Sequence, residues 1–195
     1  MPERLLRTFI ALSVPNQVRT VQDMLKTTIE AQRKVLKWVH PNSIHVTVKF
    51  NGPTPEDLIH KLNDRLNNMV TQFQPIKMQI TGTGCFPTPS RPRVLWLGLE
   101  GDLKKLFVLV QQVHRVMEKF GFPDESERFK PHVTIARIRY PQKHTPDINS
   151  FLQTEYENIP LVTDRIHLIS SELLPGGPVY TNLGTHYFSS PSNKE

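Results

Sequence analysis

Two kinds of hydrophobic spacing alternate along this chain. Apolar and polar residues alternate with a period of two in some segments, as in half-buried β-strands, and in others apolar residues recur every three or four positions, as on one face of a helix. The predicted strands are 5–14, 44–50, 76–83, 93–99, 132–140, 161–170 and 179–188, and the predicted helices are 16–33, 54–70, 102–121 and 147–153. Short strands with period-two patterning predict an α+β fold, with antiparallel or mixed sheets backed by helices.

Two of the helices begin at clear signals. Thr54 is a good N-cap, Pro55 suits the first helical position, and the acidic residues that follow oppose the positive end of the helix dipole. Asp102 is the corresponding N-cap of the later helix, which Gly121 ends. We therefore expect both side chains to cap helices.

One short phrase occurs twice, as His-Val-Thr-Val at residues 45–48 and as His-Val-Thr-Ile at residues 132–135. In a strand, this alternation sends His and Thr to one face and both aliphatic residues to the other. The simplest explanation is two half-buried strands with polar residues on their wet side. The alternative is that two related lobes present two imidazoles to one substrate, because the repeats start 87 residues apart, close to half of the chain.

Composition narrows the class of protein. The chain has 195 residues, enough for one substantial domain, and a single cysteine, Cys85, which excludes an internal disulfide and zinc sites built on paired cysteines. No apolar run approaches the length of a membrane span. We expect a cytoplasmic protein with no membrane partner. The net charge of +6 favours a phosphorylated or polyanionic partner only weakly, because the basic residues are scattered.

The two repeats favour acid-base chemistry on a phosphate. A pair of histidines lets one act as base while the other acts as acid, and the nearby Thr hydroxyls can donate to phosphate oxygens. A metal site is less well supported, because neither His has a His or Glu beside it and paired Cys residues are lacking. The sequence also lacks a Gly-x-Ser-x-Gly elbow, a P-loop and a dinucleotide fingerprint, so we expect no cofactor.

The repeats and the segments around them resemble the 2H phosphoesterase superfamily, and within it the RNA 2′,3′-cyclic phosphodiesterases, also called 2′-5′ RNA ligases. Five segments resemble the family in the family's order: 7–12, 45–52, 84–87 with 92–96, 129–137, and 171–173 with 177–180. The resemblance implies a bilobal α+β fold, with the repeat strands lining a cleft between two pseudo-symmetric lobes. We expect one domain over residues 1–195, made of two lobes that share strands, with a flexible tail at 189–195 and a monomeric state.

The resemblance also implies an activity and site residues. The activity is metal-free, ATP-independent opening of an RNA-terminal 2′,3′-cyclic phosphate to a 2′-phosphate, with 2′-5′ RNA ligation as a related reaction. We assign His45 as proton donor and His132 as proton acceptor, although the sequence does not order them, and Thr47 and Thr134 as phosphate ligands. Arg137 matches an arginine of the family. Strict alternation places it on the face opposite His132, so a bulge or strand end near Ala136 must turn it into the cleft.

Three further residues are candidates for substrate binding. Phe9 and Tyr180 could stack a terminal base, although an aromatic residue in a strand more often belongs to the core. Lys49 shares the parity of His45 and could contact phosphate, although such a lysine is more often simply solvated. The residues that we expect to be surface or packing residues are His40, His60, His114, His144, His167 and His186, together with the core residues Trp38 and Trp96.

Two alternative functions stay open at this point. One is a phosphoesterase that acts on a small cyclic nucleotide, such as a cyclic phosphate derived from ADP-ribose. The other is a nucleotide-binding or RNA-binding protein that keeps the two-lobed cleft without catalysis. The intact His and Thr of both repeats favour an enzyme.

Overall fold

The computed structural model describes residues 4–30, 35–123, 129–139, 145–175 and 177–189. Its strands are β1 (Leu5–Ser13), β2 (Leu36–Trp38), β3 (His45–Pro55), β4 (Ile76–Phe86), β5 (Val94–Gly101), β6 (His132–Ile138), β7 (Ile159–Thr163), β8 (Arg165–Leu174) and β9 (Gly177–Tyr187). Its α-helices are α1 (Gln17–Leu25), α2 (Ile59–Val70), α3 (Leu103–Glu118) and α4 (Asn149–Gln153). No helix in these described ranges is both long and apolar enough to cross a membrane.

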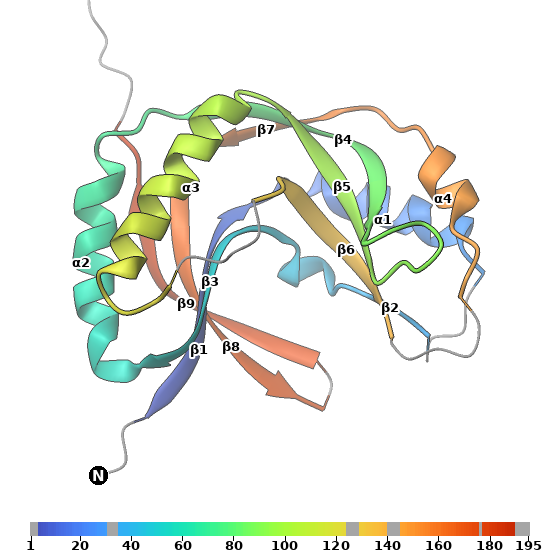
Figure 1. Cartoon of the computed structure of the whole chain (residues 1–195). Coiled ribbons are helices and arrows are strands. Elements are labelled where there is room, and N and C mark those ends of the chain that lie inside the picture. Colours follow the sequence, from blue (N-terminus) through green and yellow to red (C-terminus); the bar gives the residue numbers. More distant parts are fainter. Residues whose placement is uncertain (1–3, 31–34, 124–128, 140–144, 176, 190–195) are drawn as a thin grey trace, which may run out of the picture.

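The strands form two antiparallel sheets (Figure 1), and the predicted α+β class is confirmed. The four-stranded sheet has the order β3-β1-β8-β9, and the five-stranded sheet has the order β2-β6-β5-β4-β7. Each sheet contains one of the two repeats, and the repeat strands β3 and β6 are in contact where the sheets meet. The predicted alternation also holds, because Val46, Val48, Val133 and Ile135 are all buried in the core.

Several predicted element boundaries are wrong. The segment 161–170, predicted as one strand, is divided between β7 and β8, which lie in different sheets. The short strand β2 was not predicted. The first helix ends at Leu25 and continues only as a 3-10 turn over Lys26–Thr28; residues 31–33 of its predicted range lie outside the described residues. In the expected tail, the N–H of Ser189 donates to the carbonyl of Phe73 at 2.9 Å, and residues 190–195 lie outside the described ones.

Of the two predicted helix caps, the one at Thr54 is wrong, and the one at Asp102 is confirmed only in its position. β3 does not stop at Asn51 but runs to Pro55, so Thr54 lies buried in the strand, where its hydroxyl is 2.7 Å from that of Thr8. Burial and a hydroxyl partner in the sheet outweigh the capping preference of this residue. Asp102 does occupy the N-cap position of α3, but its carboxylate pairs with Lys105 at 2.7 Å and makes no capping hydrogen bond.

Each repeat strand contains a β-bulge at the same place in the phrase. Along β3, Ala11 pairs with Thr47 and Ile10 with Lys49, so Val48 is the extra residue. Along β6, Trp96 pairs with Thr134 and Leu95 with Ala136, so Ile135 is the extra residue. In both strands the alternation is therefore shifted by one residue directly after His-x-Thr, and two successive residues point into the core.

A helix side chain holds the carbonyl of each bulged residue. Gln22 of α1 is fully buried, and its amide N–H donates to the carbonyl of Ile135 at 3.0 Å and to that of Val39 at 2.9 Å. His114 of α3 donates from Nε2 to the carbonyl of Val48 at 3.3 Å. Each helix supports the sheet to which its preceding strand does not belong. Helix α1 follows β1 of the four-stranded sheet but supports β6 of the five-stranded sheet. Helix α3 follows β5 of the five-stranded sheet but supports β3 of the four-stranded sheet.

This arrangement predicts that Gln22 stabilises the fold. Gln22→Leu removes the side-chain donor from the part-buried carbonyl of Val39 and from the buried carbonyl of Ile135, which keeps only the N–H of Val39, so we expect the free energy of unfolding to fall by about 1–3 kcal/mol. The measurement is urea unfolding followed by circular dichroism. Gln17→Leu, the same change at an exposed position of α1, is the control. Equal unfolding midpoints for the two variants would contradict this role.

Candidate active site

The two repeats place their histidines in the same geometry. The Nδ1–H of His45 donates to the carbonyl of Ser43 at 2.8 Å, and the Nδ1–H of His132 donates to the carbonyl of Lys130 at 2.7 Å. In each case the acceptor is the backbone two residues upstream, and a carbonyl can only accept. Nε2 is therefore the atom of each neutral ring that can exchange a proton with a substrate. The hydroxyl of Thr47 lies 3.1 Å from Nε2 of His45 and donates to it.

Aromatic rings surround both imidazoles. The ring of Phe9 stacks on His45 with centroids 4.8 Å apart, and Tyr180 meets His45 edge-on at 5.5 Å. On the other strand, Phe86 meets His132 edge-on at 5.0 Å, and Trp96 lies 6.5 Å from it. Each histidine is thus held by its backbone hydrogen bond on one side and by two aromatic residues on the others.

Arg137 lies on the cleft side of β6, as its proposed role requires. The bulge at Ile135 moves the inward position to Ala136, so that Arg137 is exposed on the side of His132 and Thr134. The family resemblance required such a bulge near Ala136, and the structure has it. The positive charge of Arg137 acts on His45, His132 and Tyr180, so this guanidinium serves both halves of the site.

The pKa values of both histidines are lowered. Burial is the largest cause for His45 and for His132, and the charge of Arg137 lowers both pKa values further. For His45, the nearby His132 adds to the effect. The hydrogen bonds to Ser43 and Lys130 act in the opposite direction and raise the pKa values, but less strongly. Both imidazoles are therefore more readily neutral than a free histidine, and an anion between them favours protonation.

The same kind of bulge overturns the prediction for Lys49. Because Val48 is the extra residue of β3, Lys49 no longer shares the face of His45 but points into the core, where it is only 2% exposed. Its Nζ donates to the carbonyl of Pro123 at 2.8 Å, on the chain that follows α3. Lys49 is therefore a structural residue, and a contact with phosphate in the cleft is excluded in this conformation.

The aromatic candidates also differ from expectation. Phe9 is 4% exposed and its ring face is taken by His45, so it offers no open surface for a base and positions the imidazole instead. Tyr180 is partly exposed at the edge of the site. The sequence interpretation missed Phe86 and treated Trp96 as core, although both flank His132. The available signal was Gly84, where a side chain would overlap the indole of Trp96.

The remaining histidines lie outside the repeats. His114 holds the bulge of β3, His186 is buried with Nδ1 donating to Asn67 at 2.5 Å, and His40 accepts from the N–H of Asn42. His60 is exposed, and His144 lies outside the described residues. His167 differs from these because it lines a cavity next to His45. Within the described part of the chain, no three His, Cys, Asp or Glu side chains gather as ligands for a metal ion.

A family model described as the 2′-5′ RNA ligase superfamily matches residues 12–173. The chain belongs to this superfamily. It is 31% identical over 189 residues to the RNA 2′,3′-cyclic phosphodiesterase of Aquifex aeolicus, covering 94% of this chain and 98% of that protein. It is 32% identical over 181 residues to the protein of the same name from Archaeoglobus fulgidus, covering 91% and 98%. These matches confirm the resemblance drawn from the five segments.

Solved structures agree with this family fold. The crystal structure of TT0787 of Thermus thermophilus superposes with a TM-score of 0.78 at 26% identity, covering 95% of this chain and all of that chain (100%). The crystal structure of LigT of E. coli with 3′-AMP superposes with a TM-score of 0.71 at 18% identity, covering 95% and 99%. The second likeness concerns the fold alone. Together they show that the fold of this chain is shared with these two solved structures.

The shared effect of Arg137 on the two histidines gives a pH prediction. Since both pKa values lie below the ordinary value of about 6.5, we expect kcat/KM to peak on the acid side of pH 6.5. Arg137→Gln removes a charge that disfavours the imidazolium, so both pKa values rise. The bell-shaped pH profile of kcat/KM then moves to higher pH. We also expect kcat to fall about 100-fold, as on loss of one group that stabilises transition-state charge.

The measurement is a pH profile of kcat/KM for the wild type and the variant on the same substrate. Arg115→Gln, a charge removal at an exposed position of α3, controls for the change in net charge. A profile of Arg137→Gln that is lower but unshifted would show that Arg137 does not act on the titration of the two histidines.

Proposed function

We propose that this chain hydrolyses RNA-terminal 2′,3′-cyclic phosphate to a 2′-phosphate. The observation that carries the proposal is the pair of imidazoles from β3 and β6, each anchored through Nδ1 and each able to exchange a proton at Nε2. Membership of the superfamily and the names of its relatives support the choice of substrate. Cyclic phosphate opening needs one base and one acid on opposite sides of phosphorus, and a histidine pair supplies both.

The proposed reaction assigns one proton transfer to each histidine. Nε2 of His132 takes a proton from water as the water oxygen bonds to phosphorus. The bond from phosphorus to the 3′-oxygen breaks, and protonated Nε2 of His45 gives its proton to that oxygen. The product carries a 2′-phosphate and a 3′-hydroxyl. Exchange of protons with water then returns both imidazoles to their starting states.

Donors around the phosphate stabilise the charge that develops. Thr47 and Thr134 stand two residues after each histidine on the cleft side, where their hydroxyls donate to the non-bridging oxygens. Arg137 adds a positive charge as the pentavalent state forms. Tyr180 is the remaining substrate-binding candidate at the edge of the site. In 2′-5′ ligation, a 5′-hydroxyl would replace water and use the same two histidines.

The first test is an assay with an RNA that ends in a 2′,3′-cyclic phosphate, with EDTA present and without ATP. We expect a 2′-phosphate end to form, and His45→Asn and His132→Asn each to lower kcat about 100-fold or more, the range of general acid-base catalysis. Turnover that EDTA abolishes would contradict metal-free chemistry. Binding of the RNA without turnover would favour a non-catalytic binding protein.

A second substrate tests which histidine is the acid. When the bridging 3′-oxygen is replaced by sulfur, the leaving thiolate needs no proton. We then expect His45→Asn to lose much less activity than on the oxygen substrate, whereas His132→Asn loses as much as before. The opposite pattern would exchange the two roles.

The cytoplasmic location, the monomeric state and the single domain of two lobes that the sequence predicts belong to the same proposal. The single cysteine supports a reducing compartment. Light scattering on a sizing column tests the monomeric state directly.

A further inference from the structure

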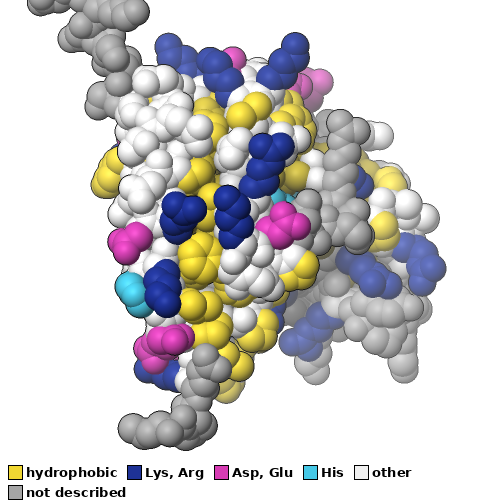
Figure 2. All heavy atoms as spheres, turned by 60° about the vertical axis from the view of Figure 1, so that its left-hand side comes forward, with side chains coloured by type: hydrophobic (Ala, Val, Ile, Leu, Met, Phe, Trp, Pro, Cys, Tyr) yellow, Lys and Arg dark blue, Asp and Glu magenta, His cyan; other side chains and the backbone are white. Residues whose placement is uncertain are grey.

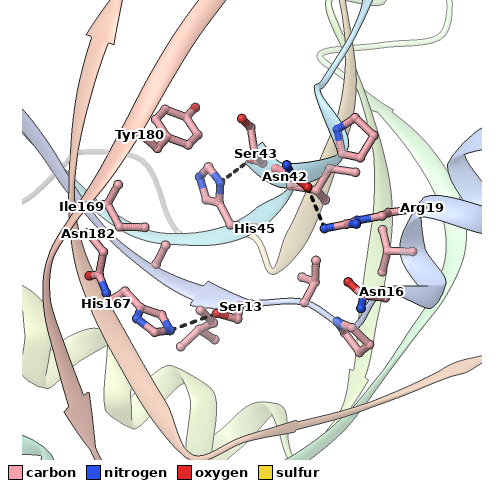
Figure 3. A pocket seen from close by; sticks show the side chains of 17 residues that line it. Ser13, Asn16, Arg19, Asn42, Ser43, His45, His167, Ile169, Tyr180 and Asn182 are labelled. Carbon is pink, nitrogen blue, oxygen red and sulfur yellow. Dashed lines mark hydrogen bonds between the residues drawn. The ribbon is translucent and has the colours of Figure 1, made fainter.

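A cavity of about 290 Å³ opens next to His45 (Figure 3), on the side of this histidine toward α1. Its walls come from the end of β1, the start of α1, the loop before β3, and β8 and β9. The volume is near the lower end of the range for small-molecule pockets. Its polar side chains include Ser13, Asn16, Arg19, Asn42, His167 and Asn182.

The cavity shares His45 and Tyr180 with the active site. Ser13 is paired with His45 across β1 and β3, and both residues line the cavity. Tyr180, whose ring meets the imidazole of His45 edge-on, forms another part of the wall. A ligand in the cavity can therefore be covalently joined to a phosphate group that His45 contacts.

A chain of hydrogen bonds gives Ser13 a defined orientation. Nδ2 of Asn182 donates to the hydroxyl oxygen of Thr185 at 2.8 Å, and that hydroxyl lies 3.0 Å from Nδ1 of His167. When the hydroxyl of Thr185 donates to Nδ1, Nε2–H of His167 donates to the hydroxyl oxygen of Ser13 at 2.9 Å. The proton of Ser13 is then directed to an acceptor in the cavity. Burial, followed by the charge of Arg165, lowers the pKa of His167, which favours this neutral form.

The charge of the cavity suits an anionic or neutral polar ligand. Arg19 donates one N–H to Oδ1 of Asn42 at 2.8 Å, which holds the guanidinium against the loop before β3 (Figure 3). Among the described residues that line the cavity there is no carboxylate. The amides, the hydroxyl and the guanidinium match the edges of a nucleobase and the oxygens of a phosphodiester.

Basic side chains also occur away from the cavity, since on the face around α2 Lys and Arg side chains are interspersed with acidic ones (Figure 2). Arg19 differs from these in lining the cavity next to His45, where it can bind a phosphodiester adjacent to the cyclic phosphate.

We propose that this cavity binds the nucleotide that precedes the cyclic-phosphate nucleotide in an RNA chain. Arg19 contacts the phosphodiester between the two nucleotides, and Ser13 with the neighbouring amides contacts the preceding nucleoside. The inference rests on the proposed function, and it makes an RNA end, rather than a small cyclic nucleotide, the preferred substrate. Arg19 and Ser13 are then specificity residues outside the two repeats.

The test compares two substrates of different length. We would measure kcat/KM for the dinucleotide ApA with a 2′,3′-cyclic phosphate and for 2′,3′-cyclic AMP, and take their ratio as the selectivity. In Arg19→Gln, we expect this selectivity to fall about tenfold, since a charge-assisted hydrogen bond is lost. In Ser13→Ala, a smaller loss, about threefold, is expected for a neutral donor. Arg65→Gln, at an exposed position of α2, is the matched control.

Each other outcome has a definite meaning. A selectivity equal to that of the wild type in both variants would overturn the inference. Equal losses of kcat/KM on both substrates would also overturn it. They would show that the cavity residues act on the terminal nucleotide or on the stability of the fold. If the wild type hydrolyses neither substrate, the proposed function fails, and the cavity is tested by binding instead. The ratio of Kd for 2′-AMP to that for ApA with a 2′-phosphate must then fall in Arg19→Gln.

Discussion

The site depends on one backbone feature, the extra residue that follows His-x-Thr in each repeat strand. Without the bulges, strict alternation would turn Arg137 into the core and Lys49 into the cleft. With them, Ala136 fills the core position and Arg137 stands on the side of both imidazoles. The bulged carbonyls are held by side chains from helices, Gln22 on Ile135 and His114 on Val48. The chemistry of the cleft is thus set by hydrogen bonds on the opposite faces of the strands.

The surroundings of the two histidines suit the proposed roles of acid and base in one reaction. Burial makes each imidazolium less stable than it is in water, and the charge of Arg137 destabilises it further, while a backbone carbonyl fixes which nitrogen keeps its proton. A phosphodiester brings a negative charge between them and offsets the cost for one proton. The pair is therefore suited to hold a single proton in the complex, which is the protonation state that an acid and a base together require.

Much of this could be predicted from the sequence, and the exceptions have physical causes. Alternation within a strand is local, so the faces of His45, Thr47, His132 and Thr134 follow from their spacing. A bulge depends on partners from distant segments, so the inward turn of Lys49 has no local signal. The side of β6 on which Arg137 lies could be predicted only indirectly. Strict alternation would place it opposite His132, and its expected role in the cleft therefore requires a bulge. Gln22 and His114 look like ordinary helix residues, because the carbonyls that they hold lie on strands far along the chain.

The exchange of helices between the two halves has a consequence for the origin of the fold. Each half consists of a strand, a helix and a returning repeat strand, and its helix supports the bulge of the other half. A half-length chain with this geometry could complete its own bulge only by pairing with a second copy, each lending its helix to the other. The pseudo-symmetry of the molecule is that of a two-fold dimer contained in one polypeptide, in which the cleft between the two copies has become a cleft between two halves of the same chain.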